Sequence, residues 1–171
     1  MNPSQSYSNP IPVLHRLVFL CLTILSGSCS SDETSDGYVM RFKANSTQQE
    51  FAAGGGQTAT FTLDDNQHIG LIVGSDGSRT MALKVYDTEA IAVAVYRQFE
   101  PKDDAFTGSL IAYQDESGTE YTQGAVIPDI HVRITEITST SVSGTFGGTL
   151  KADGKPDLSI TEGEFLVRRS D

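Results

Sequence analysis

Few residues of this chain have side chains whose chemistry goes beyond packing and solvation. Two cysteines are present, Cys21 and Cys29, and both lie in or beside one apolar run near the start of the sequence. Residues 30–171 contain no cysteine, so they offer no disulfide, no zinc-thiolate cluster and no thiol nucleophile. The reaction open to a lone cysteine beside an apolar run is attachment of a lipid to its sulfur, and Cys29 is the candidate for it.

The other candidates for chemistry are isolated histidines and acidic turns. His68 and His131 are far apart, and no H-x-H or H-E-x-x-H pattern is present, so each is interpreted as a packing or surface residue. Acidic turns could bind calcium through oxygen ligands, but none fits the D-x-[DN]-x-[DN]-G loop, and turn formation alone explains them. These turns are Asp64–Asn66, Asp76, Asp103–Asp104 and Asp115–Glu116.

Motifs for catalysis by a serine or for phosphate binding are absent from the sequence. There is no G-x-S-x-G or S-x-x-K pattern, and Gly54–Thr58 lacks the lysine of a phosphate-binding loop. A pair of carboxylates brought together from distant strands, as in glycosidases, remains open. We therefore predict no catalytic, cofactor-binding or metal-binding residue, and the sequence leaves open whether the protein is an enzyme.

The charge of the chain restricts its partners. It has 12 basic and 22 acidic residues, for a net charge of −10. Arg16 is the only charged residue among residues 1–28. Without that segment, residues 29–171 carry 11 basic and 22 acidic residues and a net charge of −11. Such a surface repels phosphate backbones, which argues against a nucleic-acid partner. The length of 171 residues predicts one folded domain.

The first 28 residues have the composition of an export signal. Residues 1–16 contain no acid and end in His15-Arg16, the apolar run Leu17–Leu25 follows, and three small residues precede Cys29. The run is too short to span a bilayer, which requires about 20 residues. We predict that residues 1–28 are removed by cleavage between Ser28 and Cys29. Residues 29–37 are then a flexible acidic tether, and residues 38–171 a single β-domain.

The segment L-S-G-S-C at Leu25–Cys29 resembles a bacterial lipobox, with Ser26 at the position where an aliphatic residue is usual. The resemblance implies that Cys29 is acylated on sulfur, becomes the new N-terminus and binds the lipid bilayer. An ordinary signal peptide cleaved nearby is the alternative. The following S-S-D-E is similar to the export signal of Bacteroidetes surface lipoproteins. It implies a place in the cell envelope, at the outer membrane, either periplasmic or surface-exposed.

From Tyr38 onwards the apolar residues alternate with polar ones, which predicts β-strands. Residues 45–56 are expected to be a polar linker and 101–104 a loop. For residues 87–99 we expect a helical turn at 87–91 followed by extended chain. A phase slip across Glu162–Glu164 predicts a β-bulge at Gly163. The remaining strands are expected near residues 38–44, 59–63, 69–73, 81–85, 110–114, 121–123, 130–134, 142–150 and 158–167.

This pattern predicts an all-β fold of about eight to ten short strands. Turn signals at 74–77 and 115–118 each predict a hairpin between the flanking strands. The expected architecture is an antiparallel β-sandwich of jelly-roll type or a partly closed barrel, with at most one short helix.

The C-terminal third carries the pattern I-x-I-T … V-S-G-T-F-x-G-T-L … I-T-x-G-x-F, within residues 130–165. It is similar to a group of Bacteroidetes lipoproteins that includes the DUF6252-type domains. The resemblance covers about residues 91–168. It implies an all-β fold and a lipid-anchored location, and it brings no catalytic residue.

Together these patterns favour a lipid-anchored binding or structural accessory module of the cell envelope, whose protein or glycan partner the sequence does not name. The alternative is a small hydrolase or carbohydrate-active enzyme on a β-sandwich scaffold. A subunit of a larger surface assembly is a third reading, which an exposed apolar patch would favour.

Overall fold

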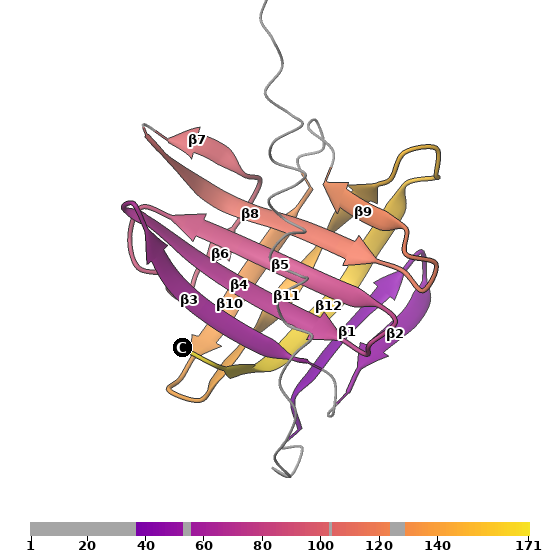
Figure 1. Ribbon diagram of the computed structural model, residues 1–171, viewed down its shortest axis with the longest axis horizontal. Helices are drawn as coiled ribbons and strands as arrows, with labels where there is room; N and C mark the ends of the chain where they lie inside the picture. Colours follow the sequence, from indigo (N-terminus) through magenta and orange to yellow (C-terminus); the bar gives the residue numbers. More distant parts are fainter. Residues whose placement is uncertain (1–36, 53–55, 103, 124–128) are drawn as a thin grey trace, which may run out of the picture. The chain divides into compact units, whose positions relative to one another are not determined.

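The computed structural model describes residues 37–52, 56–102, 104–123 and 129–171. Within these ranges the chain forms twelve β-strands and no helix, so the predicted all-β fold is confirmed (Figure 1). No membrane-spanning helix occurs in the described ranges. The strands are β1 Val39–Ala44, β2 Thr47–Phe51, β3 Thr58–Asp64, β4 Gln67–Ser75, β5 Thr80–Asp87, β6 Val95–Tyr96, β7 Glu100–Lys102, β8 Ala105–Gln114, β9 Glu120–Gln123, β10 His131–Ile137, β11 Ser141–Lys151 and β12 Leu158–Arg169.

The strands join in one large sheet with β12 as its junction. The hydrogen-bonded order is β2-β1-β12-β3-β4-β5-β8-β9-β11-β10-β6, and β7 pairs with β8. Strand β12 pairs with β3 and also with β11. Following the pairings in the order β12-β3-β4-β5-β8-β9-β11 therefore leads back to β12, so these seven strands form a closed circuit. Every strand pairing in the described part of the chain is antiparallel except the short parallel one between β12 and β3.

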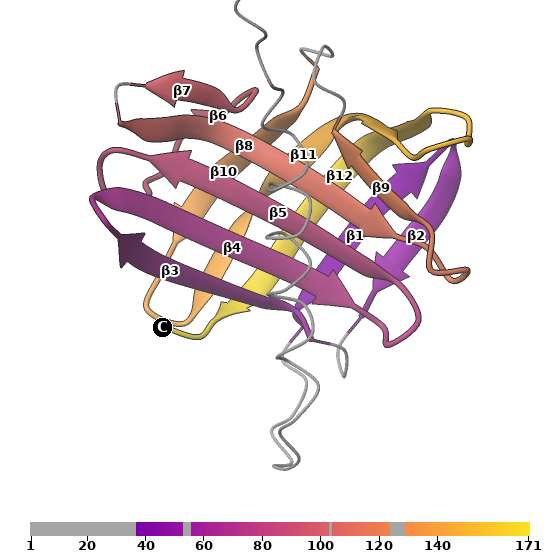
Figure 2. The ribbon, with the colours of Figure 1, turned by 45° about the horizontal axis from the view of Figure 1, so that its top comes forward.

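This sheet folds into two layers that enclose the core. Strands β3, β4, β5 and β8 form one layer, and β1, β10, β11 and β12 cross behind them, as Figure 1 and Figure 2 both show. Phe42 on β1 joins the layers, since its ring lies 5.5 Å from that of Tyr113 on β8 and 5.9 Å from that of Phe146 on β11. Burying an aromatic side chain of this size contributes about 1.5–3 kcal/mol.

The predicted linker at residues 45–56 is wrong in its first half. The chain reverses at Asn45 and Ser46, which have positive φ angles of 45° and 72°, and then forms β2 along β1. Two consecutive residues with positive φ are typical of the tight turns that suit the twist of a hairpin. Strand β2 has polar side chains at four of its five positions, so it has no apolar alternation by which it could be found.

The predicted helical turn at residues 87–91 is also wrong, because the chain bends there without forming a helix. The carboxylate of Asp87 accepts hydrogen bonds from the backbone N–H groups of Thr88 (2.8 Å) and Glu89 (3.3 Å). These bonds cap a bend of the kind that aspartate forms with the residues following it. The extended chain expected after it forms only the two-residue strand β6.

The β-bulge predicted at Gly163 is confirmed. The register of β12 shifts against both β1 and β11 at this point, and Glu162 takes a positive φ of 51°. A Cβ atom on Gly163 would lie 2.4 Å from the carbonyl oxygen of Phe146. Glycine is therefore required here because the two strands approach too closely for any side chain.

Candidate functional site

The residues that the sequence singled out for chemistry do not converge in the described part of the chain. Ser28 and Cys29 lie outside the described residues. His68 is on β4, whereas His131 is on β10 with its Nδ1 atom 3.2 Å from the carbonyl oxygen of Asp129. Among the described residues, no group of three or more His, Cys, Asp or Glu side chains could hold a metal ion.

Two of the acidic turns use their carboxylates to hold their own loops. Burial of Asp76 opposes its ionisation, but hydrogen bonds from Arg79 and Ser78 outweigh this effect and lower its pKa well below the ordinary value. The Asp115 carboxylate accepts hydrogen bonds from the Ser117 hydroxyl and from the backbone of Ser117 and Thr119, and these lower its pKa. Turn formation accounts for both carboxylates.

The outer face of the rear layer is polar and carries ion pairs. Arg41 on β1 lies between two acids, with Nε 2.9 Å from a carboxylate oxygen of Glu50 and Nη1 3.6 Å from one of Glu164. The ammonium of Lys43 is 2.7 Å from a carboxylate oxygen of Glu162. Alternation between an apolar inner face and a charged outer face is what an antiparallel sheet in contact with water shows.

The outer face of the front layer is different, because its residues are mainly apolar. The register places Ile69, Leu71 and Val73 of β4 on this face, opposite the core. The neighbouring positions on β5 and β8 continue it, and we call the whole set the β4–β5–β8 face. Its members are Ile69, Leu71, Val73, Ala82, Lys84, Tyr86, Leu110 and Ala112.

Glycines on the core side of β4 explain why its large side chains point outwards. A Cβ atom on Gly70 would lie 2.7 Å from Cγ2 of Val85, and one on Gly74 would lie 2.8 Å from the sulfur of Met40. Side chains from the other strands already fill the core at these positions. The large apolar residues of β4 therefore alternate on the opposite face, apart from Ile72.

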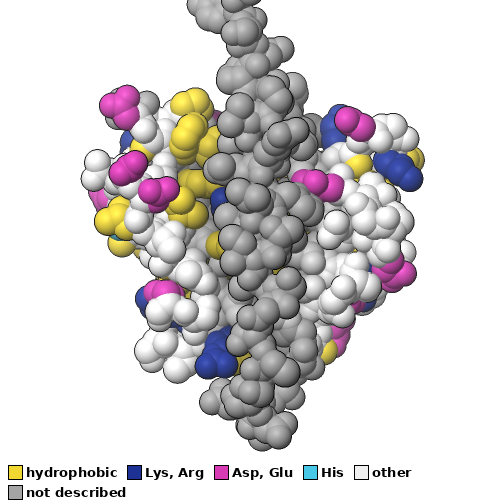
Figure 3. Space-filling view, in the orientation of Figure 1, with side chains coloured by type: hydrophobic (Ala, Val, Ile, Leu, Met, Phe, Trp, Pro, Cys, Tyr) yellow, Lys and Arg dark blue, Asp and Glu magenta, His cyan; other side chains and the backbone are white. Residues whose placement is uncertain are grey.

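One end of the β4–β5–β8 face carries three aromatic rings in contact. The ring centroids of Phe99 and Phe106 are 4.6 Å apart with their planes 19° from parallel, and Phe99 meets Tyr86 edge-on at 5.1 Å. We call Tyr86, Phe99 and Phe106 the aromatic platform. Hydrophobic surface is visible over this end of the layer in Figure 3.

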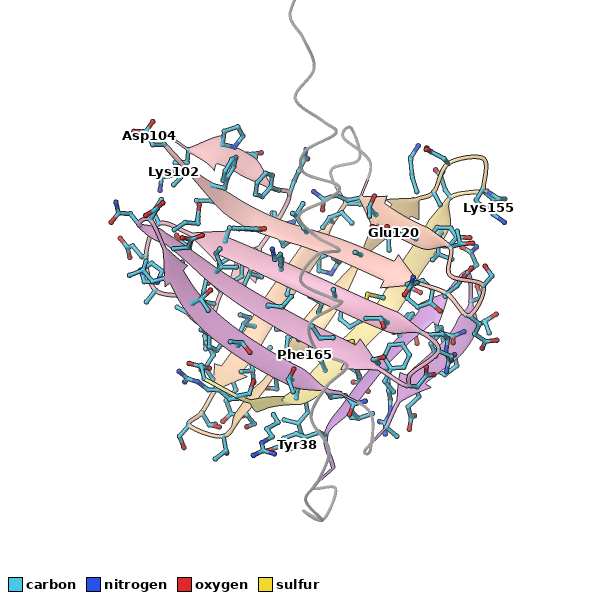
Figure 4. The ribbon with its side chains drawn as sticks, in the orientation of Figure 1. Tyr38, Lys102, Asp104, Glu120, Lys155 and Phe165 are labelled. Carbon is cyan, nitrogen blue, oxygen red and sulfur yellow. The ribbon has the colours of Figure 1, made fainter. Side chains whose placement is uncertain are left out.

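The aromatic platform is exposed to solvent at Phe106 and buried on the side towards the centre of the β4–β5–β8 face. The side chain of Phe106 is 40% exposed, whereas Tyr86 is 9% exposed and Val73 and Ala82 are 6% exposed. The charged residues Lys102 and Asp104 lie at the β7–β8 hairpin beside the platform (Figure 4). Phe106 is therefore the most exposed apolar residue of this surface and lies next to charged groups, while the other apolar residues of the face are half-buried or buried.

A glutamine holds the open ring in place. The register of β5 against β8 would set residue 88 opposite Phe106, but β5 ends at Asp87. The side chain of Gln67 takes this place, since its Oε1 accepts from the backbone N–H of Phe106 (2.6 Å) and its Nε2 donates to the carbonyl of Phe106 (3.0 Å). Nε2 also donates to the carbonyl of Asp87 (2.7 Å).

A glycine and a buried serine bring Phe99 between the other two rings. Gly108 has a φ of 106°, and a Cβ atom there would lie 2.2 Å from the carbonyl oxygen of Gln98. The hydroxyl of Ser109, which is fully buried, donates to the carbonyls of Tyr96 (3.0 Å) and Arg97 (2.9 Å). These contacts bind the segment before β7 against β8.

The aromatic platform was not predicted from the sequence. Residues 101–104 were expected to form a loop, but Glu100–Lys102 form β7 and pair with residues 105–107 of β8. Pro101 and the two aspartates after Lys102 are typical turn residues, which explains the error. The signal that could have revealed the pair was Phe99 and Phe106 flanking a turn-rich segment, as paired aromatics do in hairpins.

Comparison with known proteins adds no relative, because no protein-family model, no curated protein and no solved structure matches this chain. The resemblance of residues 91–168 to Bacteroidetes lipoproteins accordingly stays a prediction.

Proposed function

We propose that this chain is a lipid-anchored binding module of the bacterial cell envelope, held in the outer membrane through Cys29, with the aromatic platform as its binding surface. The observation that carries the binding role is the exposed ring of Phe106, stacked on Phe99 and clamped through its backbone by Gln67. An aromatic side chain that is exposed and yet rigidly held loses little conformational freedom when a ligand binds.

The anchor rests on the lipobox-like segment and on the cysteine count. Cys29 is the only cysteine of residues 29–171, so it has no competing structural role there. Two or three acyl chains contribute about 0.8 kcal/mol for each buried CH₂ group, which is enough for durable attachment. Membership of the Bacteroidetes lipoprotein group, and with it the outer-membrane location, belongs to the same proposal.

Tyr38, the first residue of the predicted β-domain, and the aromatic platform lie at opposite ends of that domain. Tyr38 is nine positions after Cys29 in the sequence, and an extended chain of this length spans at most about 30 Å. Tyr38 is at one end of the β-domain and Lys102 and Asp104 are at the other (Figure 4). A domain tethered through Tyr38 would thus present the platform away from the bilayer.

The alternative of a small hydrolase finds less support. A general acid needs a carboxyl group whose pKa is raised towards neutrality. The carboxyl groups of Asp76, Asp115 and Asp171, whose pKa departs from its ordinary value, are all shifted downwards by hydrogen bonds from their own turns or from arginine.

Metabolic labelling of expressing cells with an alkyne fatty acid tests the anchor. We expect label on the wild-type chain and on Cys21→Ala, which removes the other cysteine, and none on Cys29→Ala. Labelling that persists in Cys29→Ala, or a wild-type chain that takes up no label, would contradict the proposal.

A further inference from the structure

The accessible part of the aromatic platform is limited in area, and this limits what can bind there. Phe106 is the most exposed apolar side chain here, at 40%. Of the β4–β5–β8 face, Val73, Ala82 and Tyr86 are less than 10% exposed, and the other apolar members are half-buried, namely Ile69, Leu71, Leu110 and Ala112. A stable protein–protein interface needs about 800 Å² from each partner, mostly around a well-packed apolar centre. One exposed ring with two others behind it is better matched to contact with one or two rings of a smaller ligand.

The charges around the platform point to an uncharged ligand. The net charge of −10 repels polyanions such as nucleic acids or acidic polysaccharides. A cationic ligand would meet the ammonium of Lys84, whose Nζ already lies 5.7 Å from the centre of the Tyr86 ring. Lys84 is the only charged member of the β4–β5–β8 face, and its positive charge next to the platform disfavours a second cation there.

From these observations we propose that the aromatic platform binds a neutral saccharide, with a sugar ring stacked on Phe106. One face of a pyranose ring presents C–H groups with slight positive charge, which match the negative face of an aromatic ring. Its hydroxyl groups can at the same time exchange hydrogen bonds with polar groups beside the platform. Asp104 lies at the β7–β8 hairpin, two residues before Phe106, where its carboxylate can accept one of these bonds.

This inference rests on the proposed function, because it names the ligand class of the same surface. Its test is separate from that of the anchor. Fatty-acid labelling reports on Cys29 alone, whereas saccharide binding reports on Phe106. Labelled chains that bind no neutral saccharide would overturn the inference and leave the anchor intact, and an unlabelled chain that binds one would do the reverse.

The experiment is a titration of the full-length chain in detergent with neutral oligosaccharides of four to six units, built from glucose, xylose, mannose or galactose. Calorimetry measures the affinity, and an oligomer of galacturonic acid serves as the anionic comparison. We expect one or more neutral oligosaccharides to bind and the anionic one not to bind. Phe106→Ala should weaken binding about three- to tenfold, which is the range of one lost aromatic contact.

Two further variants separate the role of the ring from a general effect on folding. Phe106→Tyr keeps an aromatic face and should retain wild-type affinity. Leu166→Ala removes a partly exposed apolar side chain from the ionic face of the rear layer and should also bind as the wild type does. Wild-type affinity in Phe106→Ala would overturn the inference.

Two other results would overturn the inference as well. One is the absence of binding by every neutral oligosaccharide at millimolar concentration. The other is a wild-type chain that binds no saccharide but self-associates in a Phe106-dependent manner, as measured by light scattering. That result would assign the platform to a protein partner.

Discussion

Replacing Gln67 by methionine should loosen the aromatic platform without changing the core. Methionine has nearly the same length and volume as glutamine, but it lacks the amide that bonds to the backbone of Phe106. The three hydrogen bonds of 2.6, 3.0 and 2.7 Å that Gln67 makes to Phe106 and Asp87 would all be lost. Strand β5 has already ended there, so no backbone group of β5 replaces them.

The expected magnitude follows from these three bonds. Each contributes a net of about 0.5–1.5 kcal/mol, and the lower half of that range applies because water can reach the two bonds to Phe106. We therefore expect the free energy of local opening at Phe106 to fall by about 2 kcal/mol. This corresponds to about thirtyfold faster amide exchange. Hydrogen exchange at the Phe106 amide, followed by mass spectrometry or NMR, measures this directly.

Gln48→Met is the matched control, because Gln48 is an exposed glutamine on the edge strand β2. Its side chain makes one long hydrogen bond of 3.4 Å, to the carbonyl of the adjacent Gln49. Exchange at Phe106 should be unchanged in this variant. If Gln67→Met and Gln48→Met gave equal exchange rates at Phe106, the assignment of Gln67 as the residue that holds the platform would be refuted.

Three further predictions concern stability. Gly74→Ala should lower the free energy of unfolding by about 1–3 kcal/mol in urea, because the added Cβ would lie 2.8 Å from the sulfur of Met40. The control Gly56→Ala should have little effect, because there is open space around Gly56. Ser46→Gly should raise the free energy of unfolding by about 0.5–1 kcal/mol, because Ser46 has a φ of 72°, which glycine adopts more easily than serine. A lower melting temperature in this variant would contradict the turn assignment. Hydrogen bonds from Ser117 and Thr119 lower the pKa of Asp115, so its contribution to stability is complete above the ordinary pKa of 3.8 and is lost as pH falls through the folded-state pKa. Asp115→Asn should therefore flatten the curve of unfolding free energy against pH in acid.

The alternation of apolar residues predicted most of the strands, because the side-chain period of a strand is visible in sequence. The two hairpins with strong turn signals formed as expected, β4–β5 around Gly74–Gly77 and β8–β9 around Asp115–Gly118. The bulge at Gly163 was also visible, since a bulge shifts the period by one residue. Each of these features depends only on residues near one another in the chain.

The short strands escaped prediction because their residues lack the apolar alternation of a strand. Strand β2 is polar and gains its order by pairing with β1, and β7 contains Pro101, which sequence rules assign to a turn. The candidate site was missed for another reason, which is that its residues are far apart in the chain. Phe99, Phe106 and Tyr86 come from three segments, and the link through Gln67 joins residues 39 positions apart.

The segment from Ile69 to Gly74 on β4 illustrates what apolar alternation can predict and what it cannot. Alternation identified a strand, but it did not say which face was the core. The close approach of Val85 and Met40 to the glycines decides this, and it turns Ile69, Leu71 and Val73 outwards. A sheet with water on one face usually carries polar side chains there, as the ionic rear layer does. The apolar outer face of β4, β5 and β8 is thus not explained by folding alone, and its one open aromatic ring, Phe106, is where a ligand should be sought.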